Sequence, residues 1–120
     1  MTSNELAART KRFAIDVFRL VDRLPNSIAG RTIGSQLARS ASSQAANYRE
    51  ARRARSRKEF VSKISLSIQE AEETRFWLES IAELYPKVRE SQEELAGECS
   101  QLIAIFTASV KTASRDMRSS

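Results

Sequence analysis

The sequence predicts an all-α fold, an antiparallel up-down-up-down four-helix bundle that forms a single domain over residues 1–120. Turn-forming residues gather at only three places, and the stretches between them repeat apolar residues at intervals of three and four, as amphipathic helices do. The chain has 3 Gly and 2 Pro, too few for the turns of a β-sandwich or a Rossmann fold. Four such helices with short links bury their apolar stripes most simply as a bundle.

The first predicted helix covers about residues 4–24, and the second covers about residues 32–54. Ser3 or Asn4 can cap the first helix, and Pro25 ends it because proline has no N–H to donate. Its apolar stripe consists of Leu6, Phe13, Val17, Leu20 and Leu24. The stripe of the second helix is poorer in bulk and consists of Ile33, Leu37, Ala41, Gln44 and Tyr48. Small side chains allow a neighbouring helix to approach closely.

The third predicted helix covers about residues 56–85, and the fourth covers about residues 89–114. The third opens with a capping box, in which the Ser56 hydroxyl and the Glu59 carboxylate each accept a backbone N–H of the other residue. Pro86 ends this helix. Gly97 weakens the first turns of the fourth helix by up to ~1 kcal/mol relative to Ala, and the tail from Arg115 to Ser120 is expected to fray.

The charge is unevenly distributed along the chain. Residues 1–65 carry 14 basic and 5 acidic side chains, whereas residues 66–120 carry 6 basic and 10 acidic side chains. This asymmetry favours either a basic face for a polyanion or complementary faces for self-association. No apolar run approaches the ~20 residues of a membrane span, and no signal peptide is recognisable. We therefore expect a cytoplasmic protein that does not contact membranes.

Basic residues are densest where the second helix is expected to turn into the third. Six basic side chains fall within ten residues, namely Arg49, Arg52, Arg53, Arg55, Arg57 and Lys58. The exposed N–H groups at the start of the third helix also favour an anion, and the arginine fork matches a phosphate. The cluster predicts contacts to the phosphates of RNA or DNA with weak sequence preference. Two alternatives are pairing with the glutamates of a neighbouring subunit and a plain solvated surface.

A second row of arginines lies on the outer face of the first predicted helix, where it is interrupted by Asp16. Its members are Arg9, Arg12, Arg19 and Arg23. This row either extends the basic cluster or is a solvated face. No aromatic residue is interleaved with either basic run, so the sequence does not indicate a platform on which bases stack.

Polar side chains recur along one face of the second predicted helix. We expect a structural polar network made of Arg39, Ser43, Asn47, Glu50, Lys63 and Glu70. Ser43 is not expected to be a nucleophile, because the chain has no His and one helix face builds no oxyanion hole. Di-iron bundles need Glu-x-x-His pairs, so Glu50, Glu70 and Glu73 predict no metal site. We expect no enzymatic activity and no cofactor, and Cys99 is predicted to be a buried apolar residue.

Several large apolar side chains fall outside the stripes that would form the core. They are Phe18, Phe76, Trp77 and Leu84. Contiguous exposed apolar surface usually marks an interface, so these residues predict a homo-oligomer. The alternative is that Trp77 and Leu84 only widen the core stripe of the third helix.

The second and third predicted helices also carry a family resemblance. The residues that carry it are Gln36-Leu37-x-Arg39-Ser40-Ala41-x-Ser43, Ala46-Asn47-Tyr48-Arg49-Glu50-Ala51, Ala54-x-Ser56-x-x-x-Phe60-x-x-Lys63 and Glu70-Ala71-x-Glu73-Thr74-x-x-Trp77-Leu78-Glu79. This pattern resembles the bacterial four-helix-bundle proteins encoded within 23S rRNA intervening sequences. That family is related to the accessory variability determinant (Avd) of diversity-generating retroelements.

The resemblance implies a four-helix bundle that assembles as a ring, usually a homopentamer, with a basic surface. For the retroelement branch it implies binding to nucleic acid and to a reverse transcriptase. For the intervening-sequence branch it implies no enzymatic activity. Two functions therefore follow as expectations. The first is a nucleic-acid-binding accessory protein that uses the basic cluster, and the second is a scaffold ring that docks a protein such as a reverse transcriptase.

Overall fold

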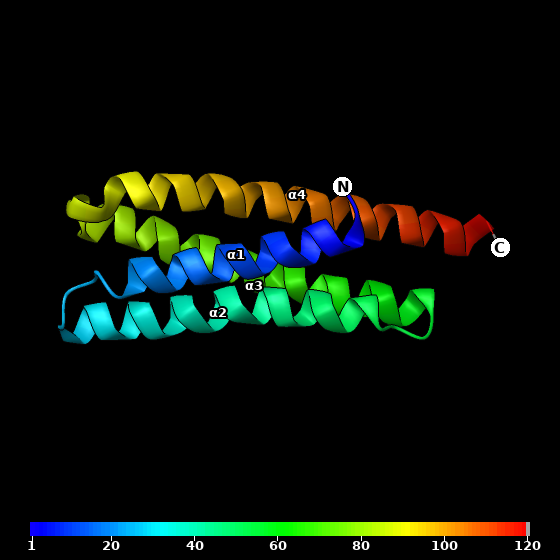
Figure 1. Ribbon diagram of the computed structural model, residues 1–120, viewed down its shortest axis with the longest axis horizontal. Coiled ribbons are helices and arrows are strands. Elements are labelled where there is room, and N and C mark those ends of the chain that lie inside the picture. The colour runs from blue at the N-terminus through cyan, green and yellow to red at the C-terminus, as the bar shows by residue number, and fades with distance from the viewer. Residues whose placement is uncertain (120) are drawn as a thin grey trace.

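A computed structural model describes residues 1–119, and these form an elongated bundle of four α-helices (Figure 1). The helices are α1 (Ser3–Val21), α2 (Ile28–Arg52), α3 (Arg57–Leu84) and α4 (Arg89–Ser119), with a 3-10 helix η1 (Pro86–Val88) before α4. Each α-helix packs against the next along the chain, and α1 also packs against α4, which closes the bundle. The molecule measures 52 × 21 × 20 Å. The predicted all-α, up-down bundle is therefore confirmed.

The first two helices differ from the prediction at their ends. Thr2, and not Ser3 or Asn4, caps α1, because its side chain accepts the Glu5 N–H at 3.1 Å. α1 ends at Val21, and the chain then tightens through 3-10-type hydrogen bonds at Arg23 and Leu24 before it reaches Pro25. α2 begins at Ile28, four residues earlier than predicted, because Ser27 accepts the Gly30 N–H at 3.0 Å. These corrections follow from which hydroxyl satisfies the first N–H groups of each helix.

The start of α3 forms half of the predicted capping box. Ser56 Oγ accepts the Glu59 N–H at 3.1 Å, as predicted. The Glu59 carboxylate, however, accepts the N–H of Arg55 at 3.4 Å instead of that of Ser56. The fourth helix starts at Arg89 as predicted, but it continues to Ser119. The predicted end at residue 114 is therefore wrong, because residues 115–119 are helical, and Ser120 lies outside the described residues.

The core is built from the predicted stripes. Phe13 and Phe106 are the largest fully buried side chains, and Tyr48 stacks on Phe106 at a ring-centroid distance of 5.8 Å. Cys99 is buried as predicted, and its Sγ donates to the Ala71 carbonyl at 3.2 Å. Burial raises the pKa of the Cys99 thiol to about 12, so it stays protonated at neutral pH. Within the described chain, no helix is both long enough and apolar enough to cross a bilayer.

A polar layer crosses this apolar core. It consists of Thr10, Ser40, Gln44, Ser67 and Thr74, all fully buried. Gln44 Nε2 donates to the Thr10 carbonyl at 3.1 Å, and Ser67 Oγ donates to the Gln44 carbonyl at 2.9 Å. The hydroxyls of Ser40 and Thr74 are joined at 2.8 Å. The polar layer therefore ties α1, α2 and α3 together by hydrogen bonds, and Gln44 Oε1 is left buried without a hydrogen-bond partner among the residues that the structure describes.

The link between α1 and α2 folds back tightly on Gly30. A Cβ atom at position 30 would lie 2.0 Å from the carbonyl oxygen of Pro25, a backbone atom that cannot move alone. At Gly97, by contrast, a Cβ atom would meet nothing within 4 Å. Gly30 therefore permits the short α1–α2 link, whereas Gly97 lies on an open helix surface.

Candidate nucleic-acid interface

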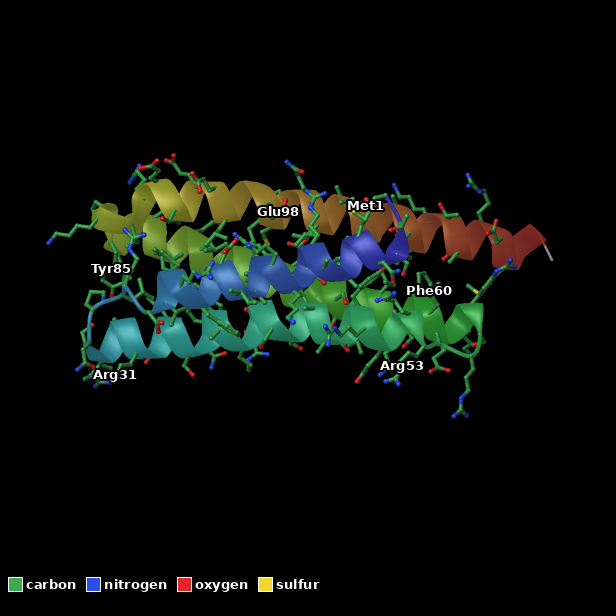
Figure 2. All side chains as sticks on the ribbon, viewed as in Figure 1. Met1, Arg31, Arg53, Phe60, Tyr85 and Glu98 are labelled. Atoms are coloured by element: carbon green, nitrogen blue, oxygen red, sulfur yellow. The ribbon has the colours of Figure 1, made fainter. Side chains whose placement is uncertain are left out.

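The predicted basic cluster lies at the turn from α2 to α3. α2 is terminated by hydrogen bonds from the N–H groups of Arg53 and Ala54 to carbonyls one turn earlier, both at 3.0 Å, and Ser56 then caps α3. Figure 2 shows this end of the bundle, where Arg53 is labelled. We call the six exposed basic side chains here the basic corner: Arg49, Arg52, Arg53, Arg55, Arg57 and Lys58. The structure thus brings all six predicted residues to one end of the molecule.

In the described part of the chain, Glu50 and Glu59 lie beside Arg53 and Arg55 without forming ion pairs to them. Among the side chains described for residues 1–117, none of the six cations of the basic corner forms an ion pair. Arg52 hydrogen-bonds to the amide oxygen of Asn4. The neighbouring Glu50 pairs with Lys63 at 2.8 Å, and this hydrogen bond raises the pKa of Lys63. The positive charge of the basic corner is therefore available to an external anion.

Among the hollows beside the basic corner, one of about 370 Å³ is lined by Glu50, Arg53, Arg55, Glu59 and Lys63, and two others share residues with each other. Of these two, the smaller hollow, of about 400 Å³, is lined by Ser3, Ala51, Arg52, Ala54, Arg55, Ser56, Arg57 and Phe60. The larger hollow, of about 650 Å³, lies between the start of α3 and the end of α4. Arg57 and Phe60 line both of them. Phe60 was not predicted as part of the basic corner, and its place four residues after the Ser56 cap was the signal that it lies beside the arginines.

The second row of arginines connects α1 to α4. Arg9 donates two hydrogen bonds to the Glu98 carboxylate and one to Gln101, all at 2.7 Å. Arg23 donates to Ser91 at 2.8 Å. Arg12 and Arg19 both approach the Asp16 carboxylate at 3.3 Å. The row therefore holds two helices together and shares its charge with carboxylates, so it does not extend the basic corner.

The predicted polar network is wrong as a single unit. Arg39 Nη1 binds Glu70 at 2.9 Å and its other terminal nitrogen binds Glu73, while Lys63 binds Glu50 farther along the same pair of helices. The Ser43 and Asn47 side chains bond only within α2, from Asn47 Nδ2 to the Ser43 carbonyl at 3.0 Å and to the Ser43 hydroxyl at 3.3 Å. Arg39 and Glu50 are eleven residues apart, about 16 Å along a helix, so they act separately.

Arg39 of α2 and its two partners on α3, Glu70 and Glu73, hold these helices together at the protein surface. The hydrogen bond from Arg39 lowers the pKa of Glu73, and the hydrogen bonds to Glu73 and Glu70 raise the pKa of Arg39. Both shifts favour the charged pair at neutral pH. The carboxylates of Glu70 and Glu73 therefore both pair with the Arg39 guanidinium and do not interact with each other. Among the described residues, no group of three His, Cys, Asp or Glu side chains is arranged to hold a metal.

The predicted interface residues differ in exposure. Phe76 and Leu84 are more than half exposed on α3, and Phe18 is 40 % exposed on α1. Trp77 is half-buried against the core and meets the Phe76 ring edge-on, with centroids 4.9 Å apart. The alternative that Trp77 and Leu84 both widen the core stripe is therefore correct for Trp77 and wrong for Leu84. Phe18 lies on a different helix from the other three.

Comparison with known proteins identifies a family. The model of a family described as "23S rRNA-intervening sequence protein" matches residues 2–108. A crystal structure of a protein of unknown function from the S23 ribosomal protein family of Bacteroides thetaiotaomicron is 29% identical, with a TM-score of 0.83. The match covers 92% of this chain and 99% of the other. No functionally curated protein matches the sequence significantly.

Proposed function

The chain belongs to the family of 23S rRNA-intervening sequence proteins, and from this membership we propose a non-enzymatic, homo-oligomeric accessory protein that binds nucleic acid. In this proposal the basic corner contacts phosphates of RNA or DNA, and the protein acts in the cytoplasm. The resemblance to the retroelement accessory proteins leads us to propose that the oligomer is a pentameric ring.

The observation that carries the proposal is the positive charge of the basic corner. Six cations lie at one end of the bundle, and the other residues described for this chain do not pair them with carboxylates. The backbone N–H groups that begin α3 lie within the same turn, and they favour an anion. Such a surface neutralises several phosphates at once and releases the counterions that surround them.

A salt titration tests this proposal. If all six cations contact phosphates of an RNA duplex, the logarithm of the binding constant should fall against the logarithm of salt concentration with a slope of roughly −5. Filter binding or fluorescence anisotropy with a duplex and with a structured RNA measures this slope. Absence of binding at 50 mM salt would end the nucleic-acid proposal. Nuclease-resistant capture of the product of a neighbouring gene would then favour the scaffold that docks a protein partner.

The oligomer has its own test. Phe76 and Leu84 expose large apolar surface on α3, and burial of that surface against another subunit is favourable because it removes apolar area from water. Light scattering at tens of micromolar protein is expected to give a multiple of the 13.5 kDa subunit mass, with five subunits for the proposed ring. A mass of one subunit would contradict self-association.

A further inference from the structure

We propose that the basic corner is built for single-stranded nucleic acid and that an unpaired base stacks against Phe60. This inference rests on the proposed function and specifies its ligand. No aromatic residue is interleaved with the basic cluster in the sequence, but Phe60, two residues after Lys58, lines a hollow together with Arg52, Arg55 and Arg57.

Phe60 lies one turn into α3, directly beside the basic corner (Figure 2). One part of its side chain packs against the core, and it is only half-buried. Its remaining surface lines the smaller and the larger hollow, together with Arg57. Arg52 and Arg55 line the smaller hollow with it. An aromatic ring bordered by three exposed guanidinium groups is the combination with which proteins hold a base and its phosphates.

The larger hollow supplies the apolar wall that a base needs. It is lined by Met1, Arg57, Phe60, Ile105, Ala108, Ser109, Thr112, Ala113 and Asp116. Its charged groups are the α-amino group of Met1 and the side chains of Arg57 and Asp116, and the other side chains are apolar or carry a hydroxyl. A neutral base suits this composition, whereas a phosphate suits the smaller hollow with its three arginines. The charges therefore orient the strand, with the base on the α4 side and the phosphates on the α2 side.

This arrangement discriminates against a duplex. In a double helix the faces of the bases are covered by their neighbours, so a protein reaches mainly the phosphates and the groove edges. An unpaired base presents its face and can stack on an aromatic ring, independently of sequence. The basic corner alone would bind both forms through phosphate contacts. Phe60 adds a contribution that only an unpaired base can use.

The test compares strands that differ only in their bases. Fluorescence anisotropy is measured with a labelled 12-nucleotide single-stranded DNA of mixed sequence and with an abasic strand of the same length and charge. The protein is expected to bind the strand with bases about tenfold more tightly, the contribution of roughly one stacked base. Phe60→Leu should abolish this difference without changing the salt slope, and Phe60→Tyr should retain it. Tyr85→Leu, which removes a half-buried aromatic ring at the opposite end of α3, is the matched control.

The outcomes separate this inference from the proposed function. Equal binding of the two strands by the wild-type protein, with steep salt dependence, overturns the inference and leaves the phosphate interface intact. No binding of any strand overturns both. If circular dichroism shows that Phe60→Leu does not fold, Phe60→Trp in a Trp77→Phe background replaces it. Fluorescence of the introduced indole should then be quenched by the strand with bases and not by the abasic strand, and lack of quenching rejects the inference.

Discussion

Reversing the charges of Arg52 and Arg53 together is expected to weaken RNA binding by about 100-fold at 50 mM salt, since each phosphate contact contributes roughly a factor of ten under these conditions. Both side chains are exposed, and neither forms an ion pair within the described residues. The doubly reversed variant, R52E/R53E, should therefore still fold, with a small loss of stability from the Arg52–Asn4 hydrogen bond and from the cation at the end of α2. Anisotropy titrations at several salt concentrations measure both the loss and the smaller salt slope.

A matched control reverses two charges at the opposite end of the bundle. Arg31 near the start of α2 and Lys87 in η1 are both exposed, so R31E/K87E changes the net charge by the same amount as the test variant. Binding should fall by only a few-fold, through the general loss of positive potential. Equal losses in the two variants would show that net charge, and not the basic corner, governs binding.

Replacing Gly30 with Ala is expected to lower the free energy of unfolding by about 3 kcal/mol, the upper end of the usual cost of overpacking. The added Cβ would lie 2.0 Å from the Pro25 carbonyl oxygen. The α1–α2 link would have to open, which would disturb the Ser27 cap that starts α2. Urea denaturation followed by circular dichroism measures the change.

Gly97→Ala is expected to have the opposite effect on stability, at a second helical glycine. Its Cβ would meet no atom within 4 Å, so only helix propensity acts, and stability should rise by up to ~1 kcal/mol. A loss of stability at both positions, or at neither, would contradict the view that steric contact with the α1–α2 link sets the requirement for Gly30.

The middles of the helices were predictable from the sequence, and their ends were less so. Apolar residues at intervals of three and four define a buried stripe wherever a helix packs, so Phe13, Leu37, Ile64 and Phe106 all fall in the core. A helix end depends instead on which of several adjacent hydroxyls accepts a free N–H. Thr2 rather than Ser3 caps α1, and nothing in the spacing distinguishes these neighbours.

The basic corner was predictable because its members are close in the chain, whereas the hollow beside it was not. Phe60 and Ile105 line that hollow from α3 and α4, and their approach depends on how these two helices pack against each other, which the residue spacing within either helix does not determine. The prediction of a single polar network was wrong for a related reason, because residues on the same face of a helix can be several turns apart.

The polar layer restricts how the helices can slide past one another. Displacing α2 along its axis by one turn would remove Gln44 from the Thr10 carbonyl and Ser40 from Thr74, and would leave these groups desolvated among aliphatic side chains. Each unmet group costs about 1–3 kcal/mol, whereas an all-apolar seam would tolerate the shift at little cost. The apolar stripe of α2 consists mainly of small side chains, and the polar layer gives this helix a single alignment against its neighbours. The arginines at the end of α2 therefore have one fixed position.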